Sequence, residues 1–192
     1  MEQLRNALSF GSILPPERIE YILTHFREKN LKTNEDFLSQ GSVSHEIGFV
    51  NHGIIRVYAL RKDGEEVTKY FVRQNQFVVD LESYYTLKPS ESALQAVVDT
   101  QIFAIRREVW ERLSEEIPKL YILTKSLTEA TLLNKIKDND FLNFGTALEK
   151  YQEFLRQYPD LAQQVPLQHI ASYLKITPQS LSRIRKNLMS NQ

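Results

Sequence analysis

The stretch "LQHIASYLKITPQSLSRIRKNL", residues 167–188, indicates the fold of this 192-residue chain most directly. Its apolar residues recur at helical spacing up to Lys175, break at "KIT", and resume after Pro178. Thr177 is a good N-cap and proline is favoured at the first helical position, so a second helix is expected to begin there. Two short helices joined by a tight turn predict a helix-turn-helix.

The charge of this stretch favours an anionic partner. The chain has 24 basic and 24 acidic residues, but from Leu167 onward it has four basic residues and no acidic one. That end therefore carries +4 and the remainder −4, a segregation typical of nucleic-acid binding. Arginine can pair with guanine and glutamine with adenine, while hydroxyls and lysine suit phosphates. The residues predicted to contact DNA are Thr177, Gln179, Ser180, Arg183, Arg185 and Lys186. The alternative is a helical hairpin that completes a core.

Between about residues 31 and 106 the hydrophobic period is that of strands. The runs "IIRVYAL" and "EEVTKYFV" flank "RKDG", which predicts a hairpin with Asp63-Gly64 at its turn. Another turn is expected at Asn51–Gly53, and residues 92–105 contain two more strands broken near Asp99. Several short strands at regular spacing predict an antiparallel barrel or roll.

Helical patterns precede and follow this region. Pro15-Pro16 opens a short helix, and Pro118 starts a long one that we expect to span about 118–139. The apolar residues of the long helix cover more than one stripe, so a second face could serve a partner helix, or the helix could be wholly internal. "TALEKYQEFLRQYP" predicts one more amphipathic helix. A boundary near 138–145 divides the chain into a sensor region, 1–140, and a DNA-binding domain, 141–192.

Several classes of function are disfavoured by what the sequence lacks. There is no cysteine, which excludes disulfides, thiolate metal sites and a thiol nucleophile. No apolar run is long enough for a bilayer and no signal peptide is evident, so a cytoplasmic protein is expected. His45 and His52 show no clustered ligand spacing, and no G-x-S-x-G motif occurs. We therefore predict neither a catalytic nor a metal site, with a cupin-like metalloenzyme as an alternative.

Two segments carry a resemblance to a known family. "GFVNHGIIRVYALRKDGEEVTKYFVRQNQFVVDL" and "VPLQHIASYLKITPQSLSRIRKNL" resemble the cyclic-AMP receptor protein/Fnr family of bacterial transcription regulators. The resemblance implies an α+β fold: an antiparallel β-roll (a double-stranded β-helix), a long dimerisation helix and a C-terminal helix-turn-helix. It also implies a homodimer that reads palindromic double-stranded DNA, with RNA polymerase as a further partner. The matching base-contact positions are Gln179, Ser180 and Arg183.

The effector pocket that the resemblance implies is degenerate. Val79-Asp80 stands where the family's cyclic-nucleotide members have Gly-Glu, and Glu91-Ser92 where they have Arg-Ser. Glu91 would place a negative charge against a cyclic phosphate, which costs several kcal/mol in a poorly solvated pocket. We therefore expect no cofactor, no conventional cyclic-AMP binding and an unidentified effector. The aligned pocket residues are Asp80, Leu81, Glu91, Ser92 and Ala93. Arg56, Arg73, Tyr58, Tyr84 and Tyr85 could line another ligand site, or be surface and packing residues.

The segment after the recognition helix is short. Family members continue into a β-hairpin wing that grips the DNA backbone, whereas only "MSNQ" follows Leu188 here, so most of the wing is expected to be missing. Fewer phosphate contacts predict weak binding by a monomer and a need for the dimer. The alternative from another class is a sensor or scaffold that acts through protein contacts without DNA.

Overall fold

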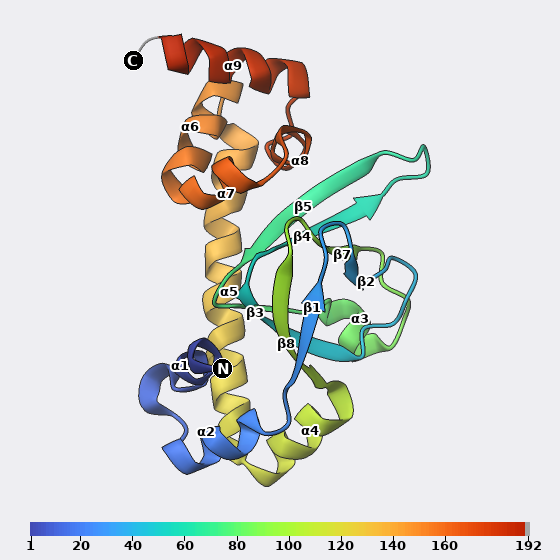
Figure 1. The fold of residues 1–192 in the computed structure, drawn as a ribbon, viewed down its shortest axis with the longest axis vertical. Coiled ribbons are helices and arrows are strands. Elements are labelled where there is room, and N and C mark those ends of the chain that lie inside the picture. Colours follow the sequence, from blue (N-terminus) through green and yellow to red (C-terminus); the bar gives the residue numbers. More distant parts are fainter. Residues whose placement is uncertain (191–192) are drawn as a thin grey trace.

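The computed structural model describes residues 1–190, without the side chains at positions 134 and 137–139. Eight strands form two four-stranded antiparallel sheets, with the orders β1-β8-β3-β6 and β2-β7-β4-β5. The sheets enclose a roll beside one long helix (Figure 1). The strands are β1 (Arg27–Leu31), β2 (Asp36–Leu38), β3 (Glu46–His52), β4 (Ile54–Leu60), β5 (Glu66–Arg73), β6 (Gln76–Val78), β7 (Ala93–Ala96) and β8 (Thr100–Arg106).

The predicted turns are confirmed, and glycine is needed at both. Gly64 has a φ of +86° in the turn between β4 and β5. Gly53 has a φ of +101°, and a Cβ there would lie 2.7 Å from the Cα of Thr100. L-amino acids with a side chain rarely adopt such angles, so both hairpins depend on the missing Cβ. The expected break near Asp99 is the connection between β7 and β8.

Side chains of the strands alternate between two cores. In β3 and β8, Val50 and Ile102 point into the roll, whereas Phe49 and Phe103 pack against helices outside it. This alternation follows from the two-residue period of a strand. The helices on the outside are α1 (Glu2–Leu8), α2 (Pro16–Leu23), α4 (Arg107–Glu116) and the first turns of α5 (Pro118–Phe144), and a 3₁₀ turn, η1 (Phe10–Ser12), follows α1. Helices α2 and α5 were predicted from the sequence, whereas α1 was not.

Helix α5 runs along the length of the molecule, from the N-terminal helices to the C-terminal helices (Figure 1). It begins at Pro118 as predicted and ends at Phe144, five residues beyond the predicted end at 139. Leu120 and Leu123 are fully buried on the side that faces the N-terminal helices and the roll. The opposite side is exposed and apolar, so the helix has two apolar stripes rather than one. The exposed apolar residues on α5 are Tyr121, Ile122, Leu132, Leu133, Ile136 and Phe144.

Four helices follow α5 and form the C-terminal unit. Thr146 and Glu149 form a capping box that starts α6. Helix α7 was not predicted, because a proline such as Pro159 can either end one helix or begin another. Leu142 of α5 belongs to the same core as the four helices, which are α6 (Ala147–Gln157), α7 (Pro159–Gln164), α8 (Leu167–Tyr173) and α9 (Pro178–Ser190).

The C-terminal unit packs against the roll. Its core includes Ile54 of β4 and Val97, which follows β7. Helix α8 lies beside the β4–β5 hairpin, and α9 lies across the end of the molecule (Figure 1). The predicted α+β arrangement of roll, long helix and terminal helix-turn-helix is confirmed.

Candidate DNA-binding face and effector pocket

Helix α9 is positioned by its cap and by one buried leucine. The Thr177 hydroxyl accepts a hydrogen bond from the Ser180 backbone N–H at 3.1 Å and donates to the Ser180 hydroxyl at 2.9 Å. Leu181 is fully buried against α8, where Ala171 leaves room for the close crossing. Lys175 adopts a φ of +57° in the turn, a position where glycine would cost less. Together these contacts direct the opposite face of α9 outward.

That outward face holds most of the predicted contact residues. Gln179, Arg183 and Lys186 are exposed and fall at the three- and four-residue spacing of one helical face. In the described part of the chain, neither Arg183 nor Lys186 has an acidic side chain within ion-pair distance. Both cations are therefore available to an external anion. Thr177 is also exposed, whereas Ser180 is half-buried in the cap.

Arg185 lies on a different side of α9. It is half-buried and lines a small cavity of about 190 Å³ with Tyr151, Leu155, Leu188 and Met189. Its side chain therefore belongs to the contact between α6 and α9. Ser182 and Asn187, which were not predicted to contact DNA, are exposed on the outward face. Their spacing of three and four from Gln179 and Arg183 was the available signal.

The predicted effector pocket follows β6. Asp80 caps α3 (Leu81–Thr86): one carboxylate oxygen accepts from the Ser83 N–H at 3.0 Å. Its other oxygen accepts from the Ser90 hydroxyl at 2.6 Å. Both oxygens thus already hold local structure together, which leaves less capacity for a ligand hydroxyl. Leu81 is exposed.

The remaining three predicted pocket residues begin the segment into β7. Glu91 is exposed, whereas Ser92 and Ala93 are buried. The Lys69 ammonium from β5 donates to the Ser92 hydroxyl at 2.7 Å. The cation that faces Ser92 therefore comes from another strand and not from position 91. This residue was not predicted, because it is 23 positions from Ser92 and only the folding of the sheet brings the two together.

Helix α5 contacts the neighbouring residue of β5. The Lys135 ammonium lies 3.5 Å from the ring centroid of Tyr70, next to Lys69 in β5. Burial, together with the negative charge of Asp80, raises the pKa of Tyr70 to about 12. Tyr70 is therefore a neutral phenol that packs against both the roll and the C-terminal unit.

The other candidate ligand residues turn away from this region or pack. Arg56 and Arg73 reach the C-terminal unit, where Arg56 contacts His169 and Arg73 contacts Asp160. Tyr84 is buried and Tyr85 is exposed. Among the described residues, no three histidine or acidic side chains gather closely enough to hold a metal ion. None of the described helices combines the length and apolar character needed to traverse a bilayer.

Residues 28–116 match the family model of the cyclic nucleotide-binding domain. FixK2 from Bradyrhizobium japonicum has a similar structure, with a TM-score of 0.76 and 18% identity over 86% of this chain and 85% of that chain. The regulator CLP of Xanthomonas campestris, described as responsive to c-di-GMP, has a TM-score of 0.69 and 17% identity over 92% and 93% of the two chains. Thermus thermophilus Catabolite Activator Protein has a TM-score of 0.58 and 19% identity over 96% and 87%. No curated protein matches the sequence.

Proposed function

From the premise that residues 28–116 form a cyclic nucleotide-binding domain within the fold of the cyclic-AMP receptor protein/Fnr regulators, we propose that this chain is a DNA-binding transcription regulator. One observation carries the proposal: the outward face of α9 presents Gln179, Arg183 and Lys186 to solvent, and no acid follows Leu167. A regulator that reads genomic DNA works in the cytoplasm, and the proposal includes this location.

The chemistry of this face fits the major groove. The groove admits one α-helix, and the first turns of a recognition helix contact base edges. Arg183 can form two hydrogen bonds with guanine, and Gln179 can do so with adenine. Lys186, Thr177 and Ser180 are proposed to contact phosphates, which fix the register without reading sequence. Arg185 is proposed to support α9 from the side of α6 rather than to read bases.

A second copy of the chain is the proposed occupant of the exposed side of α5. The positions 122, 126, 129, 133 and 136 alternate four- and three-residue steps, which is the spacing of a two-stranded coiled-coil seam. Ile122, Leu133 and Ile136 on this seam are at least half exposed, an unusual cost unless a partner covers them. Paired helices would place two α9 faces around a twofold axis, and a palindromic site would match that symmetry.

The effector region is proposed not to bind cyclic AMP in the family's manner. Asp80 is committed to α3 and Ser90, and Glu91 supplies no positive charge. Lys69 bonds Ser92, so a phosphate would have to displace or share that contact. We assign no effector. The absence of conventional cyclic-AMP binding concerns how the protein is regulated, and it is separate from the proposed binding to DNA.

Selection of random DNA by the full chain, followed by sequencing, tests the proposed function. We expect a palindromic consensus whose half-sites are about ten base pairs apart, because twofold-related helices occupy successive major grooves. If a chain shown to be dimeric retains no DNA at low salt, the proposal is wrong, and the sensor or scaffold alternative takes its place.

A further inference from the structure

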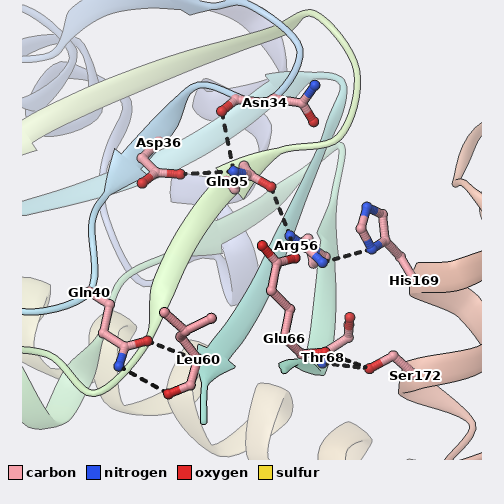
Figure 2. A network of polar contacts seen from close by, with 10 residues as sticks. All are labelled: Asn34, Asp36, Gln40, Arg56, Leu60, Glu66, Thr68, Gln95, His169 and Ser172. Carbon is pink, nitrogen blue, oxygen red and sulfur yellow. Dashed lines mark hydrogen bonds and ion pairs between the residues drawn. The ribbon is translucent and has the colours of Figure 1, made fainter. Parts of the chain in front are cut away.

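Arg56 occupies an unusual position between the roll and the C-terminal unit. Its side chain is only 2% exposed, although it lies on β4 and belongs to none of the three hydrophobic cores. A buried guanidinium is costly unless its donors are satisfied by well-placed acceptors. The acceptors of Arg56 come from three different elements, β5, β7 and α8 (Figure 2).

The contacts to the roll hold the guanidinium in place. Its Nη2 donates to Glu66 Oε2 at 2.6 Å and to Gln95 Oε1 at 2.9 Å. The amide nitrogen of Gln95 donates to the Asn34 carbonyl and to Asp36 Oδ1, both at 3.2 Å, which turns the Gln95 oxygen toward Arg56. The guanidinium carbon also lies 3.9 Å from the ring centroid of Tyr58.

The contact to the C-terminal unit requires a neutral histidine. Arg56 Nη1 lies 2.7 Å from His169 Nδ1 of α8, and because arginine only donates, Nδ1 must accept and the imidazole proton must reside on Nε2. Burial, together with the positive charge of Arg56, lowers the pKa of His169 to about 4, while the negative charge of Glu66 opposes this shift. Helix α8, with the sequence LQHIASY, has no acidic or basic side chain besides that of His169.

Two further contacts join β5 of the roll to the C-terminal unit. The backbone N–H of Thr68 in β5 donates to the Ser172 hydroxyl of α8 at 2.9 Å (Figure 2). Arg73 of β5 reaches Asp160 of α7 at 3.1 Å, away from β7. The Thr68 amide therefore loses its acceptor when α8 leaves the hairpin, and the ion pair of Arg73 offers a matched control.

We propose that Arg56 is a positioning residue that couples the effector region to the recognition helix, by tying Gln95 of β7 to His169 of α8. Gln95 lies three residues after Ser92 in the same segment, so a ligand that moves Ser92 moves an acceptor of Arg56. Helix α8 packs directly on α9, so its docking sets where the outward face of α9 points. The consequence for DNA rests on the proposed function, whereas the docking itself does not.

Amide hydrogen exchange of the full chain without DNA tests this coupling, read at Thr68 and corrected for the intrinsic rate. Release of α8 would return the pKa of His169 from about 4 to about 6.5, so the released state takes up a proton as the pH falls. Docking is thus strongest above about pH 6.5 and is lost as the pH decreases. Between about pH 7.5 and pH 5 we expect roughly 30-fold less protection at Thr68. Val72, within β5 and buried in the roll, should not change.

Four variants distinguish loss of this coupling from a general loss of stability. Arg56→Met should lower the protection of Thr68 at neutral pH, and His169→Gln should remove its pH dependence. Gln95→Leu should also lower that protection, although Gln95 bonds to no residue of α8 among its described contacts. Arg73→Met should keep the pH dependence, because its partner is in α7.

Two results would overturn the coupling: protection of Thr68 in Arg56→Met equal to that of the unaltered protein, or no pH dependence in the unaltered protein. The protection of Val72 shows whether each variant is folded. Because no DNA is present, these outcomes do not depend on whether the chain binds DNA, and a failure of the selection experiment would leave them unaffected.

Discussion

Arg183 and Arg185 stand two positions apart on α9 and face different surroundings. Arg183 is exposed on the outward face, whereas Arg185 is half-buried between α6 and α9. Two residues correspond to about 200° of helical rotation, so both side chains cannot point toward one groove. The pair is therefore a matched test of which side of α9 reads DNA.

Arg183→Ala is expected to weaken binding to the selected site by about 1–3 kcal/mol and to relax base preference at one position of each half-site. Arg185→Ala should leave the base preference unchanged, because its side chain contacts the protein. Binding titrations against the selected site and its single-base variants measure both effects. Unchanged selectivity in Arg183→Ala would contradict the placement of the outward face.

Asp80 provides a second test at this scale. Asp80→Ala removes the cap of α3 and the acceptor of the Ser90 hydroxyl, and should lower the free energy of unfolding by about 0.5–2 kcal/mol. The exposed neighbour Glu82 is the control, since Glu82→Ala should change stability by less than about 0.5 kcal/mol. Urea unfolding measures both values. Equal losses would show that the Asp80 carboxylate does not stabilise the α3 segment.

At the scale of elements, the segment from β6 to β7 holds the predicted effector-pocket residues. Ser92 of this segment is buried. The cation near Ser92 is Lys69 on β5, and position 91 holds an exposed glutamate. This lysine comes from β5 of the same sheet, with β4 between β5 and β7, and the β-bulge between Val57 and Tyr58 leaves Lys69 without an opposing residue on β4.

Calorimetry with cyclic AMP examines this segment. At micromolar nucleotide we expect no heat of binding, because Asp80 and Lys69 are already bonded and Glu91 would repel a phosphate. Lys69→Met is the companion variant. Micromolar binding by the unaltered protein that disappears in Lys69→Met would refute the expectation and place the phosphate on Lys69.

At the scale of the whole molecule, α5 connects everything else. One of its faces packs on the roll and the N-terminal helices, and its C-terminal end joins the core of the C-terminal unit. Its other face is apolar and exposed to solvent. The C-terminal unit is also tied to the roll by a shared core and by Arg56. A partner bound along α5 would thus fix the relative positions of two α9 helices.

Leu133→Glu should therefore abolish the dimer and reduce DNA occupancy by about 10²–10⁴-fold, since the second half-site no longer benefits from the first. Leu133 is 60% exposed, so the change should not unfold the monomer. Phe10→Glu, at a residue of similar exposure in the N-terminal helices, should leave both properties intact. Sedimentation and binding titrations provide the readouts. A dimer that survives Leu133→Glu would show that its interface lies elsewhere.

The sequence alone determined the strands, the long helix and the terminal helix-turn-helix, because these follow from local information. The local signals are the hydrophobic periods of two and of 3.6 residues and the single residues Gly53, Gly64, Pro118 and Thr177. Each of them acts over a few neighbouring positions. Helix α7 was missed for a local reason too, since a proline can end one helix and begin the next.

Only the tertiary structure decided which side chains meet. Lys69 faces Ser92, Arg185 turns toward α6, and Arg56 joins β7 to a histidine 113 positions away. Such meetings depend on sheet register, helix rotation and the docking of one unit on another. Periodicity shows which faces are buried, but not what lies opposite them, and the chemistry of a site depends on what lies opposite.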